Sequence, residues 1–202
     1  MGYFNQDSYV TNSTIGQSFG ALAWDKIGPL IGGGEYRSLE LPAGSQSQQG
    51  EDLALSLDRA CGIDGLQILP SGICIGLAHR VQRHPDYSTW TIRSERTSGA
   101  RTELAKRLAA FEVPGALGPY WTVQAYLDPS GALQSVAAIE TEILYLVAAR
   151  ELAKGSALVV KEHTNGQDRN RFLSVSWQLE KVQARHPDLA LTPRIWRAPA
   201  RP

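Results

Sequence analysis

The stretch of this chain that most constrains its fold is GIDGLQILPSGICIGLAHRVQ, residues 62–82. Apolar residues recur in it at the spacing of β-strands, and a short Pro-Ser-Gly connection separates its two halves. Side chains of a strand alternate between the two faces of a sheet, and short connections that contain glycine join antiparallel strands. The stretch therefore predicts a hairpin of two antiparallel strands, at 63–69 and 73–83.

Helices and further strands are predicted around this hairpin. Residues 87–95 are rich in β-branched and aromatic side chains, which predicts a third antiparallel strand. Apolar residues at helical spacing predict helices at 50–61, 99–111 and 142–154. Other strands are predicted at 36–41, 120–128, 133–141 and 157–164, with a segment that begins as a strand at 172–184. This pattern predicts an α/β fold: a single domain, residues 49–190, with a central mixed β-sheet flanked by helices.

Two terminal segments are expected to lie outside this core domain. Residues 1–48 are rich in Gly, Ser, Gln and Asn, which predicts an irregular N-terminal arm with short strands or turns. Residues 191–202 contain the sequence RIWRAPARP, which predicts a basic, exposed C-terminal tail that orders on nucleic acid or on a protein partner.

The composition favours a soluble protein of the cytoplasm. A hydrophobic fraction of 43% is sufficient for a sizeable core. No apolar run approaches the roughly 20 residues that a membrane helix needs, and the first residues lack the pattern of a secretory signal. Cys61 and Cys74 each lie in an apolar context, which predicts reduced, buried thiols.

Charge is distributed unevenly although the formal net charge is zero. Residues 1–65 contain three basic and eight acidic side chains, so the rest of the chain is net basic. Within it, residues 79–107 contain seven Arg or Lys side chains and three acids. Such a stretch is typical of a surface that binds a phosphate backbone, and a solvated surface with some salt bridges is the alternative.

The order helix, strand, strand, strand, helix, strand over residues 50–128 resembles that of the PD-(D/E)XK nuclease superfamily, which has the restriction-endonuclease-like fold. The stretch GIDGLQILPSGICIGLAHRVQR resembles the segment in which GID begins one strand and (E/Q)xK ends the next. The resemblance implies a nuclease that uses Mg²⁺ or Mn²⁺ to hydrolyse phosphodiesters. Such chemistry needs oxygen ligands on the metal and a cation near the phosphate.

The resemblance implies that Asp64 is a metal ligand and that Arg80 stands in the lysine position of the motif. Ala78 falls where the family has its second ligand, and an alanine cannot bind a metal. Arg80 stays protonated, so it can hold a phosphate but cannot act as a base. For Asp64 the alternative is a turn acid that accepts hydrogen bonds from nearby backbone N–H groups.

If the motif is shifted along the predicted strand, other residues become candidate metal ligands. Gln82 shares a strand face with Ala78 and Arg80, so its amide oxygen is a candidate metal ligand and catalytic residue beside Asp64. Glu51 is the candidate ligand from the helix at 50–61, with Asp58 as a second choice. Acids in the first turn of a helix are also favoured by its dipole without any function.

Basic and aromatic residues next to the hairpin complete the candidate site. The expected contacts to nucleic acid are Arg83, Arg93, Arg96, Arg101 and Arg107. Trp90, Trp121 and Trp177 lie in predicted strands, where they are core residues or, alternatively, stack on bases. The expected function is a divergent metal-dependent nuclease or nucleic-acid-processing protein. Its alternatives are a catalytically inactive nuclease-like subunit that binds nucleic acid, protein partners or further copies of itself, and an unrelated α/β enzyme with a small-molecule pocket.

Overall fold

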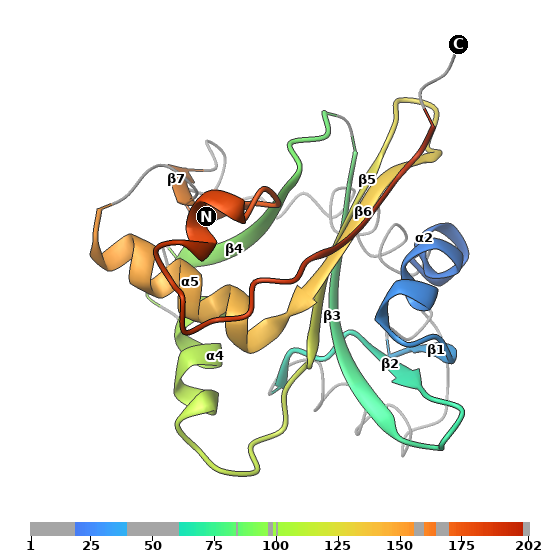
Figure 1. Cartoon of the computed structure of the whole chain (residues 1–202), viewed down its shortest axis with the longest axis horizontal. Coiled ribbons are helices and arrows are strands. Elements are labelled where there is room, and N and C mark those ends of the chain that lie inside the picture. Colours follow the sequence, from blue (N-terminus) through green and yellow to red (C-terminus); the bar gives the residue numbers. More distant parts are fainter. Residues whose placement is uncertain are drawn as a thin grey trace, which may run out of the picture.

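The computed structural model describes residues 19–39, 61–83, 85–96, 99, 101–155, 160–164 and 170–199. These residues form an α/β fold built on a mixed six-stranded sheet, as the sequence predicts (Figure 1). The predicted helix at 50–61 lies outside the described residues, apart from Cys61 at its end. No helix in the described part of the chain is both long and apolar enough to cross a membrane.

The six-stranded sheet has the order β1-β2-β3-β5-β6-β9. Its strands are β1 (Glu35–Ser38), β2 (Gly65–Ile68), β3 (Cys74–Arg83), β5 (Trp121–Leu127), β6 (Leu133–Glu140) and β9 (Arg194–Arg197). β2 and β3 form the predicted antiparallel hairpin. β3 pairs in parallel with β5, and every other pairing in this sheet is antiparallel. The sheet is therefore mixed because of one strand pair.

A second sheet holds the strand that follows the hairpin. β4 (Thr89–Glu95) is the predicted strand at 87–95, and it is antiparallel to β8 (Arg171–Ser176). β8 also pairs with β7 (Val160–Thr164), which gives the order β4-β8-β7. The expectation that β4 extends the hairpin as its third strand is wrong, because β5 pairs with the edge of β3 that such a strand would need.

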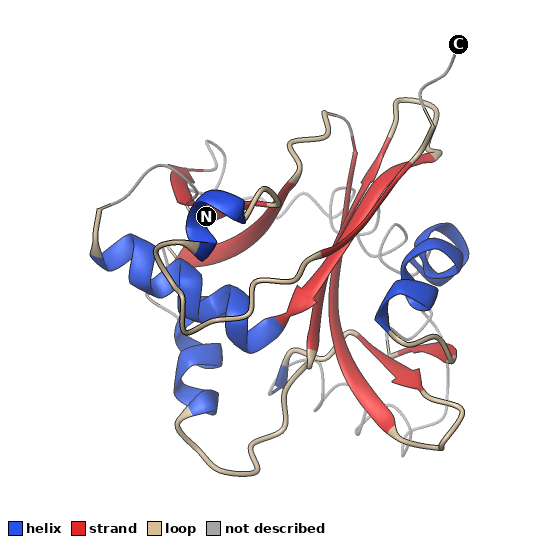
Figure 2. Cartoon of the chain, viewed as in Figure 1, coloured by secondary structure: helices blue, strands red, loops and turns tan. Residues whose placement is uncertain are grey.

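Helices cover both faces of the six-stranded sheet (Figure 2). On one face lie α2 (Phe19–Ile27) and a short 3-10 helix, η1 (Gly28–Ile31). On the other face, with the second sheet, lie α4 (Glu103–Phe111), α5 (Thr141–Ala153) and the short α6 (Glu180–Gln183). α2 falls within the segment 1–48 for which the sequence predicts an irregular arm. Phe19, Ala23 and Ile27 recur every four residues and are fully buried, which explains the helix.

The C-terminal segment is a strand for part of its length. β9 pairs antiparallel with β6 at the edge of the sheet, and three of its four residues are exposed, as the sequence predicts for this tail. Trp196 packs against the core on the α2 side of the sheet, with the Lys26 ammonium 5.8 Å from its ring. Arg197 lies 5.4 Å from the Trp177 ring and 3.6 Å from an Asp86 carboxylate oxygen. The tail is basic, as predicted, but these contacts hold its first residues on the domain.

The free cysteines also differ from expectation. Cys74 at the start of β3 is exposed, and Cys61 is partly buried, whereas both are predicted to be buried. Cys74 is the first residue of β3, and it follows the exposed residues of the hairpin turn.

His79 on β3 joins α2 to the sheet. Its imidazole stacks on the Phe19 ring with the centroids 4.4 Å apart, and its Nε2 forms a 2.7 Å hydrogen bond with the Tyr36 hydroxyl. Nδ1 is buried and has no hydrogen-bond partner among the described residues. Because burial disfavours the charged imidazolium, it lowers the pKa of His79 to about 4. The docking of α2 therefore requires neutral His79.

This pKa predicts a specific pH dependence of stability. The folded pKa lies below the unfolded value of about 6.5, so the stabilising contribution is complete at pH 7 and is lost as the pH falls towards 4. Between pH 7 and pH 5 the unfolding free energy should fall by roughly 1–2 kcal/mol through this residue. In His79→Gln, which does not titrate, this part of the decrease should be absent. Urea unfolding at both pH values measures it, and an equal decrease in both proteins would contradict the assignment to His79.

Candidate functional site

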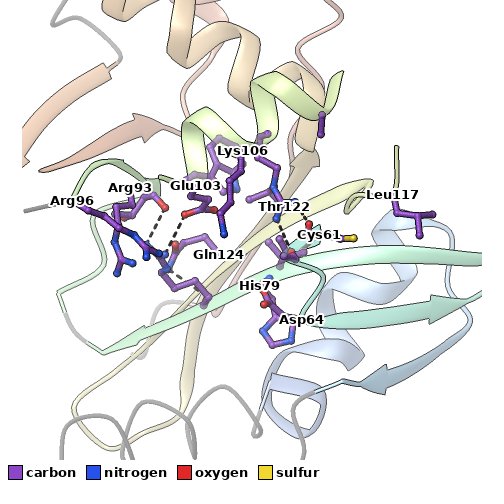
Figure 3. A pocket seen from close by; sticks show the side chains of 18 residues that line it. Cys61, Asp64, His79, Arg93, Arg96, Glu103, Lys106, Leu117, Thr122 and Gln124 are labelled. Atoms are coloured by element: carbon purple, nitrogen blue, oxygen red, sulfur yellow. Dashed lines mark hydrogen bonds and ion pairs between the residues drawn. The ribbon is translucent and has the colours of Figure 1, made fainter. Parts of the chain in front are cut away.

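A pocket of about 280 Å³ lies on the face of the six-stranded sheet that the second sheet and α4 cover (Figure 3). We call it the basic pocket. Its wall residues come from β3, β4, α4 and β5, from the segments before β2 and β5, and from the residue after β4. They are Cys61, Gly62, Asp64, Ala78, His79, Arg80, Trp90, Thr91, Arg93, Arg96, Glu103, Lys106, Arg107, Ala110, Leu117, Thr122, Val123 and Gln124.

The strand register positions the part of the pocket formed by the sheet. Ala78 of β3 is opposite Thr122 of β5, and Arg80 is opposite Gln124. Because side chains alternate along a strand, these four residues share the face away from α2. Ala78 and Gln124 are almost fully buried, at 7% and 2% exposed, so this part of the pocket is deep.

The charge of the pocket is strongly positive. Five cationic side chains line it: Arg80, Arg93, Arg96, Lys106 and Arg107. Asp64 and Glu103 are the two acids among its lining residues. In Figure 3, Arg93, Arg96, Glu103 and Lys106 gather at one side of the pocket, whereas Asp64 lies beside His79 at the other. The pocket is therefore suited to an anion on the side of the arginines.

Arg80 is held in position by two neighbours. Its Nη1 donates to the Thr91 carbonyl oxygen at 3.1 Å, and its Nη2 lies 3.6 Å from a Glu103 carboxylate oxygen. About a third of the Arg80 side chain remains exposed. Glu103 also accepts a hydrogen bond from the buried Tyr145 hydroxyl. Burial and the nearby carboxylate raise the pKa of Tyr145 well above its usual value, so the phenol stays protonated and donates.

Helix α4 presents three charged residues to the pocket. Thr102 caps the helix, accepting a 3.2 Å hydrogen bond from the Ala105 N–H. Glu103, Lys106 and Arg107 follow at positions i, i+3 and i+4, which places them on one helix face. Of these, Glu103 and Lys106 are functional-site candidates that the sequence analysis missed. Their helical spacing beside the basic stretch was the signal for them.

Arg107 has a structural role. It is 6% exposed, and its guanidinium donates to the carbonyl oxygens of Cys61 and, at 2.6 Å, of Gly62. These bonds tie α4 to the segment that leads into β2. Gly62 has a φ of +58°, and a Cβ on it would overlap with the Arg107 guanidinium.

Substitution of Gly62 should therefore be more harmful than backbone strain alone explains. Gly62→Ala adds the displacement of Arg107 to the cost of a positive φ, and we expect a loss of about 2–3 kcal/mol in unfolding free energy. Gly72→Ala is the matched control, because Gly72 has a φ of +83° and nothing lies within 4 Å of its added Cβ. This control should lose about 1 kcal/mol. Equal losses in urea unfolding would show that the Arg107 bonds contribute nothing.

Asp64 lies at the edge of the pocket next to β3. Its Oδ2 accepts a 2.8 Å hydrogen bond from the His79 backbone N–H. This bond agrees with the alternative prediction, in which Asp64 accepts hydrogen bonds from nearby backbone N–H groups. Carboxylates accept several bonds, so this one does not prevent a further ligand.

The remaining predicted site residues lie in different places. Arg93, Arg96 and Arg107 line the basic pocket with Asp64 and Arg80. Arg83 and Arg101 are exposed and do not line it. Gln82 is two residues beyond Arg80 on β3, so strand alternation gives it the same face, but it is also not among the lining residues. Glu51 and Asp58 lie outside the described residues.

The described residues supply only part of a ligand set for the expected Mg²⁺ or Mn²⁺. Among them, no group of three or more His, Cys, Asp or Glu side chains is placed to hold a metal ion. Of the two acids in the pocket, Glu103 contacts Arg80 and Tyr145, and Asp64 accepts the His79 backbone N–H. Magnesium is often held by one or two carboxylates together with water and phosphate oxygens. Asp64 fits as one such ligand.

Comparison with protein-family models, curated proteins and solved structures yields no match. What the site can do follows from its residues. Guanidinium groups are planar donors that match the oxygens of a phosphate, and an ammonium adds a point charge. The geometry therefore favours the binding of phosphate groups.

Proposed function

We propose that this protein binds nucleic acid through phosphate groups held in the basic pocket. The observation that carries this proposal is the convergence on one pocket of Arg80, Arg93 and Lys106, from three different elements, and of Arg96, which directly follows β4. A solvated surface of scattered charges would not bring them together. Neutralising phosphates is the dominant source of affinity for nucleic acids, so a pocket of this charge suits that ligand.

Two of the arginines are well placed for a phosphate. Arg80 is oriented by the Thr91 carbonyl and Glu103 before any ligand arrives, which reduces the entropy lost on binding. Arg96 has a buried Nε with no hydrogen-bond acceptor among the described residues. A buried donor without an acceptor is costly, and a phosphate oxygen would satisfy it.

The proposal extends to the finer fold. We place β2, β3, β4, α4 and β5 as the core of a restriction-endonuclease-like domain that has lost part of its motif. The order strand, strand, strand, helix, strand over these elements supports this placement, as does the position of Arg80 near the end of β3. The pairing of β4 with β8 is the point at which the chain departs from the arrangement expected of the hairpin.

Charge removal in the pocket tests the binding function. Arg80→Gln and Arg96→Gln should each weaken the binding of labelled oligonucleotides, single-stranded and duplex, by about tenfold, because each removes a charge-assisted contact to phosphate. Fluorescence anisotropy over a range of salt concentrations measures this, and each lost contact should reduce the salt slope by about 1.

Arg83→Gln and Arg101→Gln are the matched controls. Each removes one positive charge from an exposed residue outside the pocket, so affinity should change less than about twofold. If the four variants weaken binding equally, binding is a property of the overall charge and the pocket has no special role. If the wild-type protein binds neither form of nucleic acid, the proposed function is wrong.

Metal-dependent hydrolysis of phosphodiesters is the second candidate function. It is favoured by Asp64, which lines the same pocket as Arg80. A metal ion there would supply a bound water of lowered pKa as the nucleophile. Asp64 would hold the ion, and Arg80 would hold the phosphate. Ala78 weakens the case for hydrolysis, because it stands where the nuclease motif has its second metal ligand. That ligand must then come from another residue such as Glu51.

Asp64→Asn separates hydrolysis from binding. The asparagine oxygen still accepts the His79 N–H but lacks the carboxylate charge that a metal needs. If the protein is a nuclease, cleavage of DNA or RNA in Mg²⁺ or Mn²⁺ should fall by at least about a hundredfold, with binding retained. Gel assays of purified wild-type and variant protein measure cleavage. Intact substrates with the wild-type protein would refute the nuclease and leave the binding function.

A further inference from the structure

We infer that the basic pocket accepts one nucleotide of an unpaired nucleic-acid strand, in preference to the continuous backbone of a duplex. This inference rests on the proposed function and concerns the class of ligand that the same site selects. The depth of the pocket carries it, and Trp90 in the pocket wall is the residue that tests it.

The pocket is a recess and not a flat basic surface. Ala78 and Gln124 of the six-stranded sheet form its floor and are only 7% and 2% exposed, and Trp90 of the second sheet, which is 1% exposed, lines its wall. The second sheet and α4 stand over this floor and carry most of the cationic side chains (Figure 3). A ligand must therefore enter between the elements to reach the arginines and the floor together.

Duplex and unpaired strands differ in their ability to enter such a recess. A duplex is stiff over about 150 base pairs, and its phosphates lie on a continuous outer surface. It would meet the exposed side chains at the rim. An unpaired strand is flexible at every residue, so it can turn a single phosphate, with its sugar and base, inward. The depth of the pocket therefore favours the unpaired strand.

Trp90 is the pocket residue through which the inference can be tested. The side chain is 99% buried because its exposure is 1%, it lines the pocket, and its indole Nε1–H has no acceptor among the described residues. A buried N–H without an acceptor is rare and unfavourable in folded proteins. If a nucleotide enters the recess as inferred, one of its oxygens becomes an acceptor for this N–H. Trp90 is a core residue, which is one of the two predictions made for it, and it also lines the pocket.

Trp177 is the matched control that the chain itself offers. It is also 1% exposed with an unpartnered Nε1 among the described residues, and its ring centroid lies 5.9 Å from that of Trp90. It does not line the pocket. Replacing either tryptophan by phenylalanine removes an indole N–H from the same core. A difference between the two variants therefore reports on the pocket.

The test compares three ligands and two variants by fluorescence anisotropy at one salt concentration. The ligands are a labelled single strand, the blunt duplex of the same sequence, and that duplex with a single-stranded overhang. The single strand and the overhang should bind at least about tenfold tighter than the blunt duplex. Trp90→Phe should weaken single-strand binding by about three- to tenfold, which is the effect of one lost hydrogen bond, and Trp177→Phe should not.

A second measurement keeps the inference testable if Trp90→Phe is poorly folded. In ¹H–¹⁵N spectra of the wild-type protein, a trinucleotide should shift the indole N–H resonance of Trp90 more than that of Trp177. Equal binding of duplex and single strand, with dependence on Arg80 and Arg96, would overturn this inference but leave the proposed function. Equal effects of the two phenylalanine variants, or equal indole shifts, would also overturn it. An absence of binding to every ligand would refute the proposed function itself.

Discussion

The parallel pairing of β3 with β5 is the contact on which the rest of the structure depends. It makes β3 an inner strand of the six-stranded sheet and sets Arg80 opposite Gln124. Because β5 takes this edge of β3, β4 joins β8 in a second sheet, and the recess that forms beside them is the basic pocket. The opposite face of β3 carries His79, which packs against α2. One strand therefore serves both the hydrophobic core and the candidate site.

Cations can gather in this recess because the domain holds several of them in place. Arg107 is bound to two backbone carbonyl groups, and Arg80 contacts the Thr91 carbonyl and the Glu103 carboxylate. Glu103 is itself held by the hydroxyl of Tyr145, a residue of α5. Like charges at close range repel each other, and these acceptors offset part of that repulsion. Arg80 and Arg107 are therefore held in position before a ligand arrives, which reduces the entropy lost on binding.

Much of the local structure and part of the site could be predicted from the sequence. The hairpin, the strands around Trp90 and Trp121, and the helix of Tyr145 follow from apolar spacing, which depends only on neighbours along the chain. Strand alternation also gives the shared face of Ala78 and Arg80. Arg93 and Arg96 were expected near the hairpin because they end the next strand. Lys106 and Glu103 were missed, because their approach to Arg80 depends on how α4 crosses the sheet.

The sequence by itself determined the α/β class, the hairpin and the basic stretch that supplies the pocket, since these follow from local periodicity and charge. Only the tertiary structure decided that β4 leaves the hairpin, that α2 and β9 belong to the domain, and that Arg107 binds backbone while Arg96 faces a pocket. The physical reason is that strand partners and buried contacts are chosen by competition among distant segments for the same edges and faces. The residues next to a strand in the chain therefore do not reveal which distant segment it pairs with.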